Sequence, residues 1–133
     1  MNKINVGDIL LIRKYLDGTK NLSKHSFVVI KSEAGEIQGL EYDVICNVLS
    51  SFKDEEQRKR KLGYPGNFEI LHEDSSVPDG NTKDGYIKAE QFYFFNLDKI
   101  DYAVIGKLNT DVLNKLLLFI SDLGEIKLII DNL

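Results

Sequence analysis

The sequence predicts a mainly β protein, built as a small antiparallel β-barrel with a C-terminal helix and short appended helices. Short segments rich in β-branched and aromatic residues alternate with turn signals over most of the chain. One long apolar helical segment follows near the C-terminus, instead of the strand–helix alternation that a doubly wound parallel sheet requires. These two observations favour a barrel.

The strands are expected where apolar or β-branched runs lie between polar turns. They cover residues 6–13, 27–30, 42–49, 68–71, 84–91 and 126–130. The first is apolar on both faces, which is typical of a central strand. A polar loop over 14–25 contains the turn dipeptide Asp17-Gly18, and Gly35 and Gly39 interrupt the connection to the third strand.

Residues 50–62 interrupt the strands with a charged segment. Ser51 can cap a helix whose first turn is acidic and whose last turn is basic, which suits the helix dipole. Because only Phe52 and Leu62 can anchor this helix, we expect a solvated helix or an insertion. An arm that contacts RNA is the alternative.

The next connections are expected to be short. A polar loop covers 72–84, with a turn at Pro78-Asp79-Gly80 and with His72 as a surface residue. Four consecutive aromatic residues, 92–95, are expected to pack in the core and at a subunit contact rather than to stack on bases. A short helical turn follows over 96–101.

The C-terminal helix is expected over 110–122, from a cap at Thr110 to a stop near Gly124. Its apolar residues cover more than one helical face: Val112, Leu113, Leu116, Leu117, Leu118, Phe119, Ile120 and Leu123. We therefore expect the helix to be buried on two sides, by the barrel and by a partner chain.

Length and composition limit the class of protein. The 133 residues, 43% of them hydrophobic, are enough for one domain over 1–133 with a real core. No apolar run approaches the ~18 residues of a membrane span, and the N-terminus lacks a signal segment, which predicts a cytoplasmic protein without membrane contact. Cys46 lies among apolar neighbours and should be a buried thiol. With two distant histidines and no cysteine pair, we expect no metal and no other cofactor.

Charge is distributed unevenly along the chain. The net charge of -4 argues against a protein that coats nucleic acid. Residues 1–31 nevertheless contain six Lys or Arg residues against two Asp, whereas residues 69–84 contain five acidic residues against one Lys. Such a layout allows one basic groove on an acidic protein.

The segment 84–91, DGYIKAEQ, has the strongest chemical pattern. As an extended strand it directs Ile87 and Ala89 to a core face, and Lys88 and Glu90 to the opposite face. The Cα atoms of Lys88 and Glu90 would then lie about 7 Å apart. A cation beside a carboxylate can bind phosphate and move protons, although a surface ion pair is the other interpretation.

Several motifs occur in an informative order along nearly the whole chain. They are VGDILLIR, KHSFVVI, YDVICNVLSS, FEI, DGYIKAEQF with FNLDKID, and IGKLNTDVLNKLLLFI. This order and spacing resemble the MazF/PemK family of toxins from type II toxin–antitoxin systems. The resemblance implies an SH3-like β-barrel of the Kid/CcdB type, a homodimer that an antitoxin protein neutralises, and metal-independent cleavage of single-stranded RNA.

The resemblance also implies positions for the functional residues. His25 lies where the family usually has the arginine of a Lys-Arg-Pro sequence, which here reads Lys-His-Ser. Ser50 lies where many members have a threonine or serine after the third strand. Lys88 and Glu90 match the arginine and aspartate that the Kid-like branch uses in catalysis, and Gln91 completes the family's acidic-residue–Gln pair.

These residues suit RNA cleavage in which the 2′-OH attacks the adjacent phosphate and leaves 2′,3′-cyclic phosphate and 5′-OH ends. Such a reaction needs a base, an acid, and cations for the charge of the phosphorane. We expect Glu90 to be the base, Lys88 and His25 to be the cation and the acid, and Ser50 to donate a hydrogen bond to phosphate. The expected RNA-binding residues are Arg13, Lys20, Lys24 and Gln91. DNA lacks the 2′-OH and should remain uncut.

Other interpretations stay open for the same residues. His25 can be a loop end, Ser50 a helix cap and Gln91 a backbone tie. A catalytically silent relative that acts through partners would not cleave RNA, nor would a binding protein of CcdB type on the same barrel. The chain has no tryptophan, which gyrase poisons of CcdB type typically carry near the C-terminus, so this last alternative is weakened.

Overall fold

The structure is a computed structural model that describes residues 4–76 and 84–133. Its strands are β1 (Asp8–Ile12), β2 (Tyr15–Asp17), β3 (Lys20–Leu22), β4 (His25–Lys31), β5 (Gly35–Ile37), β6 (Leu40–Tyr42), β7 (Val44–Ser51), β8 (Asn67–Ile70), β9 (Ser75–Ser76), β10 (Gly85–Lys88), β11 (Gln91–Phe95), β12 (Tyr102–Leu108) and β13 (Lys127–Ile129). Its helices are α1 (Glu55–Leu62) and α2 (Thr110–Ser121), with short 3₁₀ turns η1 (His72–Asp74) and η2 (Leu97–Lys99).

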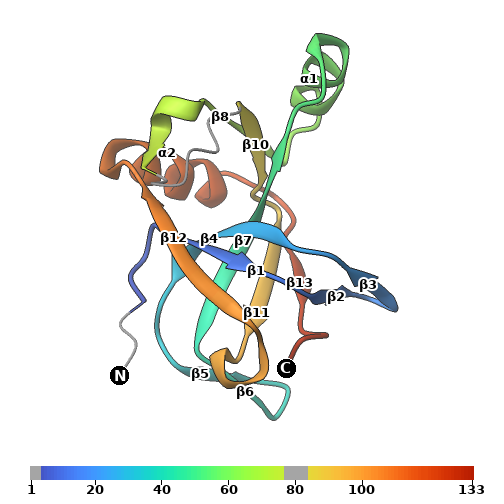
Figure 1. Cartoon of the computed structure of the whole chain (residues 1–133), viewed down its shortest axis with the longest axis vertical. Coiled ribbons are helices and arrows are strands. Elements are labelled where there is room, and N and C mark those ends of the chain that lie inside the picture. The colour runs from blue at the N-terminus through green and yellow to red at the C-terminus, as the bar shows by residue number, and fades with distance from the viewer. Residues whose placement is uncertain (1–3, 77–83) are drawn as a thin grey trace.

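Within these described ranges, a nine-stranded sheet curls into a half-barrel (Figure 1). The strand order is β13-β11-β7-β4-β1-β12-β9, and β10 pairs with both β7 and β8. The pairs are antiparallel except for β11 with β13, which is parallel. The predicted mainly β class is therefore confirmed.

Five of the six expected strands are present with shifted ends, and the structure adds several others. The long strand β12, which the sequence did not specify, pairs with β1. The polar loop predicted over 14–25 is instead the β2–β3 hairpin, whose turn contains Asp17 and Gly18. Gly18 has a φ of +64°, which explains why this turn takes glycine. A second hairpin, β5–β6, occupies the connection marked by Gly35 and Gly39.

The predicted single strand over 84–91 is wrong, because the chain turns at Ala89 and Glu90 between β10 and β11. Leu49 pairs with Ile87, and Cys46 pairs with Tyr93. An advance of three residues along β7 therefore corresponds to an advance of six residues from β10 to β11. The three extra residues form a bulge. Lys88 ends β10, and Glu90 lies in the turn that follows it.

Two apolar clusters fill the interior on opposite faces of the sheet. One includes Phe27, Cys46, Tyr93 and Phe95, so the aromatic run 92–95 contributes to the core as expected. The second lies under α2. Burial raises the pKa of the Cys46 thiol, which agrees with the predicted buried cysteine.

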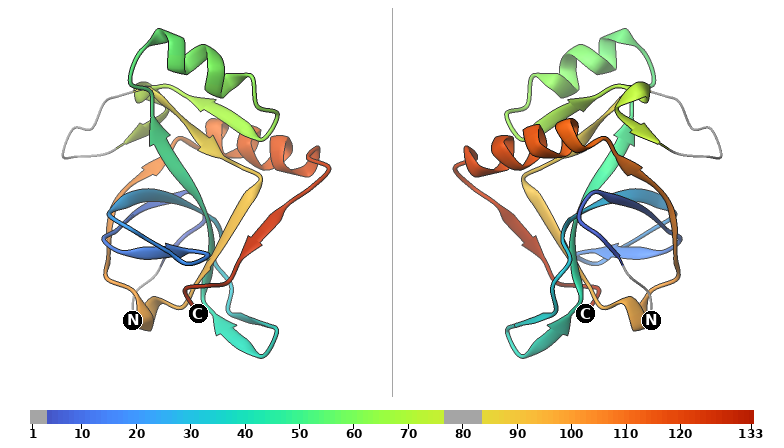
Figure 2. Two further views of the ribbon diagram at one scale, coloured as in Figure 1. Left: turned by 90° about the vertical axis from the view of Figure 1, so that its right-hand side faces the viewer. Right: turned by 90° about the vertical axis from the view of Figure 1, so that its left-hand side faces the viewer.

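The charged helix α1 is solvated, as predicted, because none of its residues is buried. Its cap differs from the prediction: β7 continues through Ser51, and Asp54 accepts a hydrogen bond of 2.7 Å from Gln57 N. Figure 2 shows α1 at the top of the molecule, projecting beyond the sheet.

The helix α2 packs on the sheet through Val112 and Leu116. Its N-cap is Asn109 rather than the predicted Thr110. Leu117 and Leu118 remain 37% and 66% exposed, so the sheet covers one side of the helix, and the expected cover on the other side stays a prediction. No helix in the described part of the chain is long and apolar enough to cross a membrane.

The expected short elements near the ends of strands have mixed outcomes. The helical turn predicted over 96–101 is confirmed as η2. The loop predicted over 72–84 contains η1 and β9, and its Pro78-Asp79-Gly80 turn lies outside the described residues.

Candidate functional site

A row of polar side chains crosses the end of the sheet beyond the first apolar cluster. Ser50 of β7 pairs with Tyr86 of β10, and Tyr86 pairs with Glu69 of β8. Because residues directly opposite each other in neighbouring strands point to the same face, these three side chains share one face. It is the face that carries Phe27 and Val48 farther along the strands.

His25 joins this row from β4. The pairing of Ser26 with Leu49 means that the register, continued by one residue, brings His25 opposite Ser50. The His25 ring lies edge-on to Tyr15 with centroids 5.8 Å apart, and its Nδ1 is 3.2 Å from the Tyr15 hydroxyl oxygen. Burial, with a smaller contribution from Asp17, raises the pKa of Tyr15 to about 12, so its hydroxyl is neutral and can donate to a bare Nδ1 or accept from a protonated Nδ1.

Lys88, at the end of β10, lies on the same face of the sheet as Ser50. It follows Tyr86 by two residues and pairs with Asn67 of β8. Its side chain is partly exposed. The sheet therefore brings together three of the four predicted catalytic residues, His25, Ser50 and Lys88, on one face.

Glu90 lies in the bulge, two residues after Lys88 and outside the strand. The Glu90 carboxylate lies against Gly66, where an added Cβ would come within 2.3 Å of it. The backbone oxygen of Glu90 accepts a hydrogen bond of 2.7 Å from Lys127 N. A hollow of about 180 Å³ opens here, lined by Glu90, Gln91, Glu125, Ile126 and Lys127.

Gln91 begins β11 at the end of the same bulge. Its backbone oxygen accepts a hydrogen bond of 2.8 Å from Asn47 Nδ2, so the side chain of Asn47 ties the backbone here. The side-chain oxygens of both Gln91 and Asn47 are buried without a hydrogen-bond partner.

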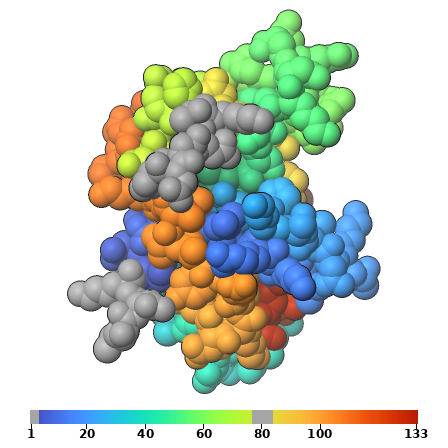
Figure 3. Space-filling view, viewed as in Figure 1, coloured from blue at the N-terminus to red at the C-terminus, as the bar shows by residue number. Residues whose placement is uncertain are grey.

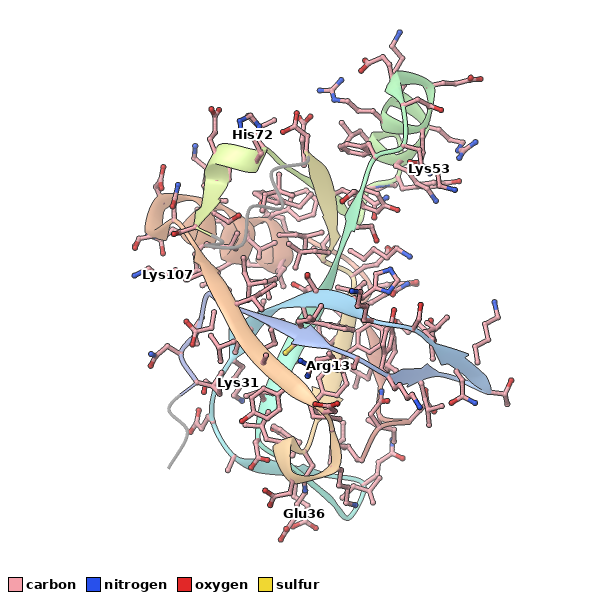
Figure 4. All side chains as sticks on the ribbon, viewed as in Figure 1. Arg13, Lys31, Glu36, Lys53, His72 and Lys107 are labelled. Atoms are coloured by element: carbon pink, nitrogen blue, oxygen red, sulfur yellow. The ribbon has the colours of Figure 1, made fainter. Side chains whose placement is uncertain are left out.

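The predicted RNA-binding cations divide into two groups. Arg13, which is labelled in Figure 4, is engaged by Asp101, with 2.8 Å between Nη1 and Oδ1. Lys20 and Lys24 are exposed, on β3 and just before β4. The hairpin that carries Lys20 is fixed by the C-terminal segment, since the Asn132 amide accepts from Leu16 N at 2.6 Å and donates to Leu16 O at 3.0 Å.

Two basic projections flank the polar row. In the left view of Figure 2, β7 and β10 run between α1 above and the β2–β3 hairpin below. A notch separates the two projections at the right-hand edge of the space-filling view (Figure 3). The exposed cations of the α1 projection are Lys53, Lys59 and Arg60. Cations on both sides of the row would attract a phosphate chain.

Arg58 ties α1 to the sheet at one end of the row. Its Nη2 and Nε lie 2.6 and 3.1 Å from Glu69 Oε2. This hydrogen-bonded ion pair raises the pKa of the guanidinium and occupies the Glu69 carboxylate. Glu90, two residues after Lys88 in the chain, has no such ion pair among the described residues.

A histidine–carboxylate pair that the sequence did not indicate lies just beyond the paired ends of β8 and β10. Asp84 Oδ1 accepts hydrogen bonds from His72 N at 2.8 Å and from His72 Nδ1 at 3.1 Å. These bonds lower the pKa of Asp84. A cavity of about 80 Å³ beside them is lined by His72 and by four serines, Ser26, Ser50, Ser51 and Ser75. Nothing in the local sequence pattern around His72 could have identified its partner 12 residues away.

The described residues contain no group of three or more His, Cys, Asp or Glu side chains that could hold a metal ion. The polar face offers an imidazole, a hydroxyl and an ammonium group instead. Such groups can donate hydrogen bonds to a phosphate and exchange protons with it.

Comparisons with known proteins add no assignment. No model of a known protein family matches the chain, and no curated protein matches it in sequence.

Proposed function

We propose that this protein is an endoribonuclease of MazF/PemK type, which cleaves single-stranded RNA without a metal ion and is neutralised by an antitoxin. The observation that carries this proposal is the shared face of His25, Ser50 and Lys88, which come from three different strands. The curled antiparallel sheet is compatible with the SH3-like barrel that this family would have.

In the proposed reaction, the RNA supplies its own nucleophile. Glu90 takes the proton of the 2′-OH, the 2′-oxygen bonds to phosphorus, and the bond from phosphorus to the 5′-oxygen breaks. Protonated His25 gives a proton to the leaving 5′-oxygen. Lys88 and Ser50 stabilise the phosphorane oxygens by charge and by a hydrogen bond. The products are a 2′,3′-cyclic phosphate and a 5′-OH.

The proposed substrate path runs between the two basic projections. Lys20 and Lys24 would contact phosphates on one side of the polar row, and the exposed cations of α1 would contact them on the other. Arg13 is a weaker candidate than the sequence suggested, because Asp101 already engages its guanidinium.

The proposed homodimer would use the apolar side chains that the sheet leaves uncovered. Leu118 of α2 and Leu128 of β13 are 66% and 51% exposed. Such exposure of large aliphatic side chains is typical of surfaces that bind another chain. An antitoxin segment would occupy the RNA path and exclude the substrate.

The direct test is to incubate the purified protein with a long unstructured RNA in excess EDTA and to map the ends produced. We expect internal cleavage with 5′-OH and cyclic phosphate ends. Lys88→Ala should abolish most of the cleavage. Lys107→Ala removes an equal charge from an exposed position on β12 and should leave cleavage unchanged (Figure 4). Products with 5′-phosphate ends, or cleavage that stops in EDTA, would contradict this mechanism. RNA binding without cleavage would favour the catalytically silent alternative.

A further inference from the structure

Phe52 extends the polar face beyond the catalytic candidates. It follows Ser50 by two residues and stacks on Tyr86, with ring centroids 5.3 Å apart and an interplanar angle of 28°. The Phe52 backbone N–H donates to Asp84 O at 3.2 Å, which fixes the chain where it leaves β7.

The two stacked rings differ in exposure. Tyr86 is only 4% exposed and pairs with Ser50, so it forms a rigid support inside the sheet. Phe52 is partly exposed above it. An aromatic ring with accessible surface beside phosphate-binding groups can stack on an unpaired base, whatever the base is. A base within a duplex cannot stack in this way, because its faces are covered by its neighbours.

The helix next to Phe52 supplies cations for the adjacent backbone. Lys53 follows Phe52 directly, and Lys59 and Arg60 lie exposed on α1. Because α1 buries none of its own residues, it is held to the sheet by surface contacts. These include the Arg58–Glu69 ion pair and the hydrogen bond from Asn67 Nδ2 to Lys61 O, and the Phe52–Tyr86 stack lies where the chain enters the helix. An aromatic surface with neighbouring cations is the combination by which proteins hold single strands.

We propose that Phe52 is a stacking platform for a base next to the cleaved phosphate, and that it selects single-stranded RNA. This role rests on the proposed function, since it assumes that RNA lies along the polar face. Phe52 does not touch the reacting atoms, so it determines specificity rather than performing chemistry.

The absence of tryptophan from the chain allows a specific reporter. Phe52→Trp would carry the only indole of the protein, and a single-stranded 2′-O-methyl oligoribonucleotide binds without being cut, because its nucleophile is blocked. We expect this oligonucleotide to quench the fluorescence of the introduced indole strongly. The matched control is Tyr64→Trp, at a position that is 53% exposed and follows the other end of α1. Equal quenching in both variants, or none in Phe52→Trp, would overturn the platform.

A second measurement separates stacking from a structural role of the ring. Phe52→Leu should raise the Kd for the same oligonucleotide by between about fivefold and a hundredfold, and Phe52→Tyr should restore it. In a second series, one nucleotide at a time is replaced by an abasic unit. The difference in Kd between the parent and Phe52→Leu should disappear at only one position of the oligonucleotide. An equal reduction of this Kd difference at every position would overturn the proposal. If Phe52→Leu unfolds, the Tyr and Trp variants with the abasic series still decide the question.

The outcomes are independent of the cleavage assay. Position-specific stacking without any RNA cleavage would support the platform and reject the endoribonuclease. Cleavage in EDTA without position-specific stacking would do the opposite.

Discussion

Asp84, just before β10, accepts two hydrogen bonds from His72, one from the backbone N–H and one from the ring Nδ1. These bonds lower the pKa of Asp84 below its ordinary value of 3.8 in the folded protein. A carboxylate with a depressed folded-state pKa contributes stability above its unfolded-state pKa, and this contribution is lost as pH falls through the folded-state value.

Replacing Asp84 by asparagine should therefore destabilise the protein at neutral pH and matter less in acid. Urea unfolding at pH 7 and at about pH 3 should show the difference from the parent shrinking at the lower pH. Glu36→Gln, on the remote β5–β6 hairpin in Figure 4, is the control that should leave both midpoints unchanged. If the unfolding midpoints of variant and parent differ by the same amount at both pH values, the ionised Asp84 carboxylate does not stabilise the protein through its contacts with His72.

His25 should control the alkaline side of the pH profile of cleavage. Its imidazole must be protonated to act as an acid, so activity should decline as pH rises, whereas Glu90 must be ionised and limits activity in acid. His25→Arg keeps a permanent charge and should retain phosphate binding at high pH. Rates measured across pH 5–9 should show a flatter alkaline limb for this variant. His72→Gln changes the other histidine and should not alter the shape; a normal profile for His25→Ala would exclude the proposed role.

The pairing of β10 with β7 depends on one glycine at the edge of the polar row. A Cβ at Gly85 would lie 2.1 Å from the Ser50 backbone oxygen, so any side chain must push the strands apart. Gly85→Ala should lower the free energy of unfolding by about 1–3 kcal/mol, as overpacking in a core does. Denaturant unfolding measures this directly. Gly124→Ala is the matched control, because no atom lies within 4 Å of its added Cβ, and an equal loss there would contradict the steric explanation.

Strands were predictable where one feature of the sequence dominates. Apolar runs indicated β1, β4 and β7, and a dipeptide with obvious turn chemistry indicated the bend at Gly18. Solvation of α1 followed from its lack of apolar residues. Each of these properties is local, so the sequence contains it without reference to the rest of the fold.

The break between β10 and β11 could not be predicted from such patterns. Ala89 is fully buried although it lies in the turn, so the apolar alternation continues through the point where the strand ends. The turn is held from elsewhere in the chain, by Ala89 N donating to Gly66 O at 2.9 Å and by Asn47 donating to Gln91 O. The same limit explains the missed pair of His72 with Asp84.

The candidate site was predictable in part for the same physical reason. His25, Ser50 and Lys88 each lie on a strand whose register depends on the apolar pattern, so their common face follows once the strands pair. Glu90 lies in the bulge, and its position depends on tertiary contacts with Gly66 and Lys127.

At the scale of the whole molecule, exposed aliphatic side chains predict self-association. Leu118→Lys should convert the expected homodimer into a monomer, because it places a charge on the apolar side of α2 that the sheet does not cover. Sedimentation at micromolar concentration measures the change. Leu40→Lys, on the distant β6, is the control with the same substitution. A parent protein that is monomeric at this concentration would remove the basis for a dimer.

The central claim is that the polar face cleaves RNA by using the nucleophile of the RNA itself. An oligoribonucleotide with one 2′-deoxy sugar, placed on the 5′ side of a mapped cleavage site, tests this step alone. We expect the parent protein to leave that bond intact while it cuts the all-ribose control at the same position. Cleavage of the 2′-deoxy bond at an undiminished rate would contradict the mechanism.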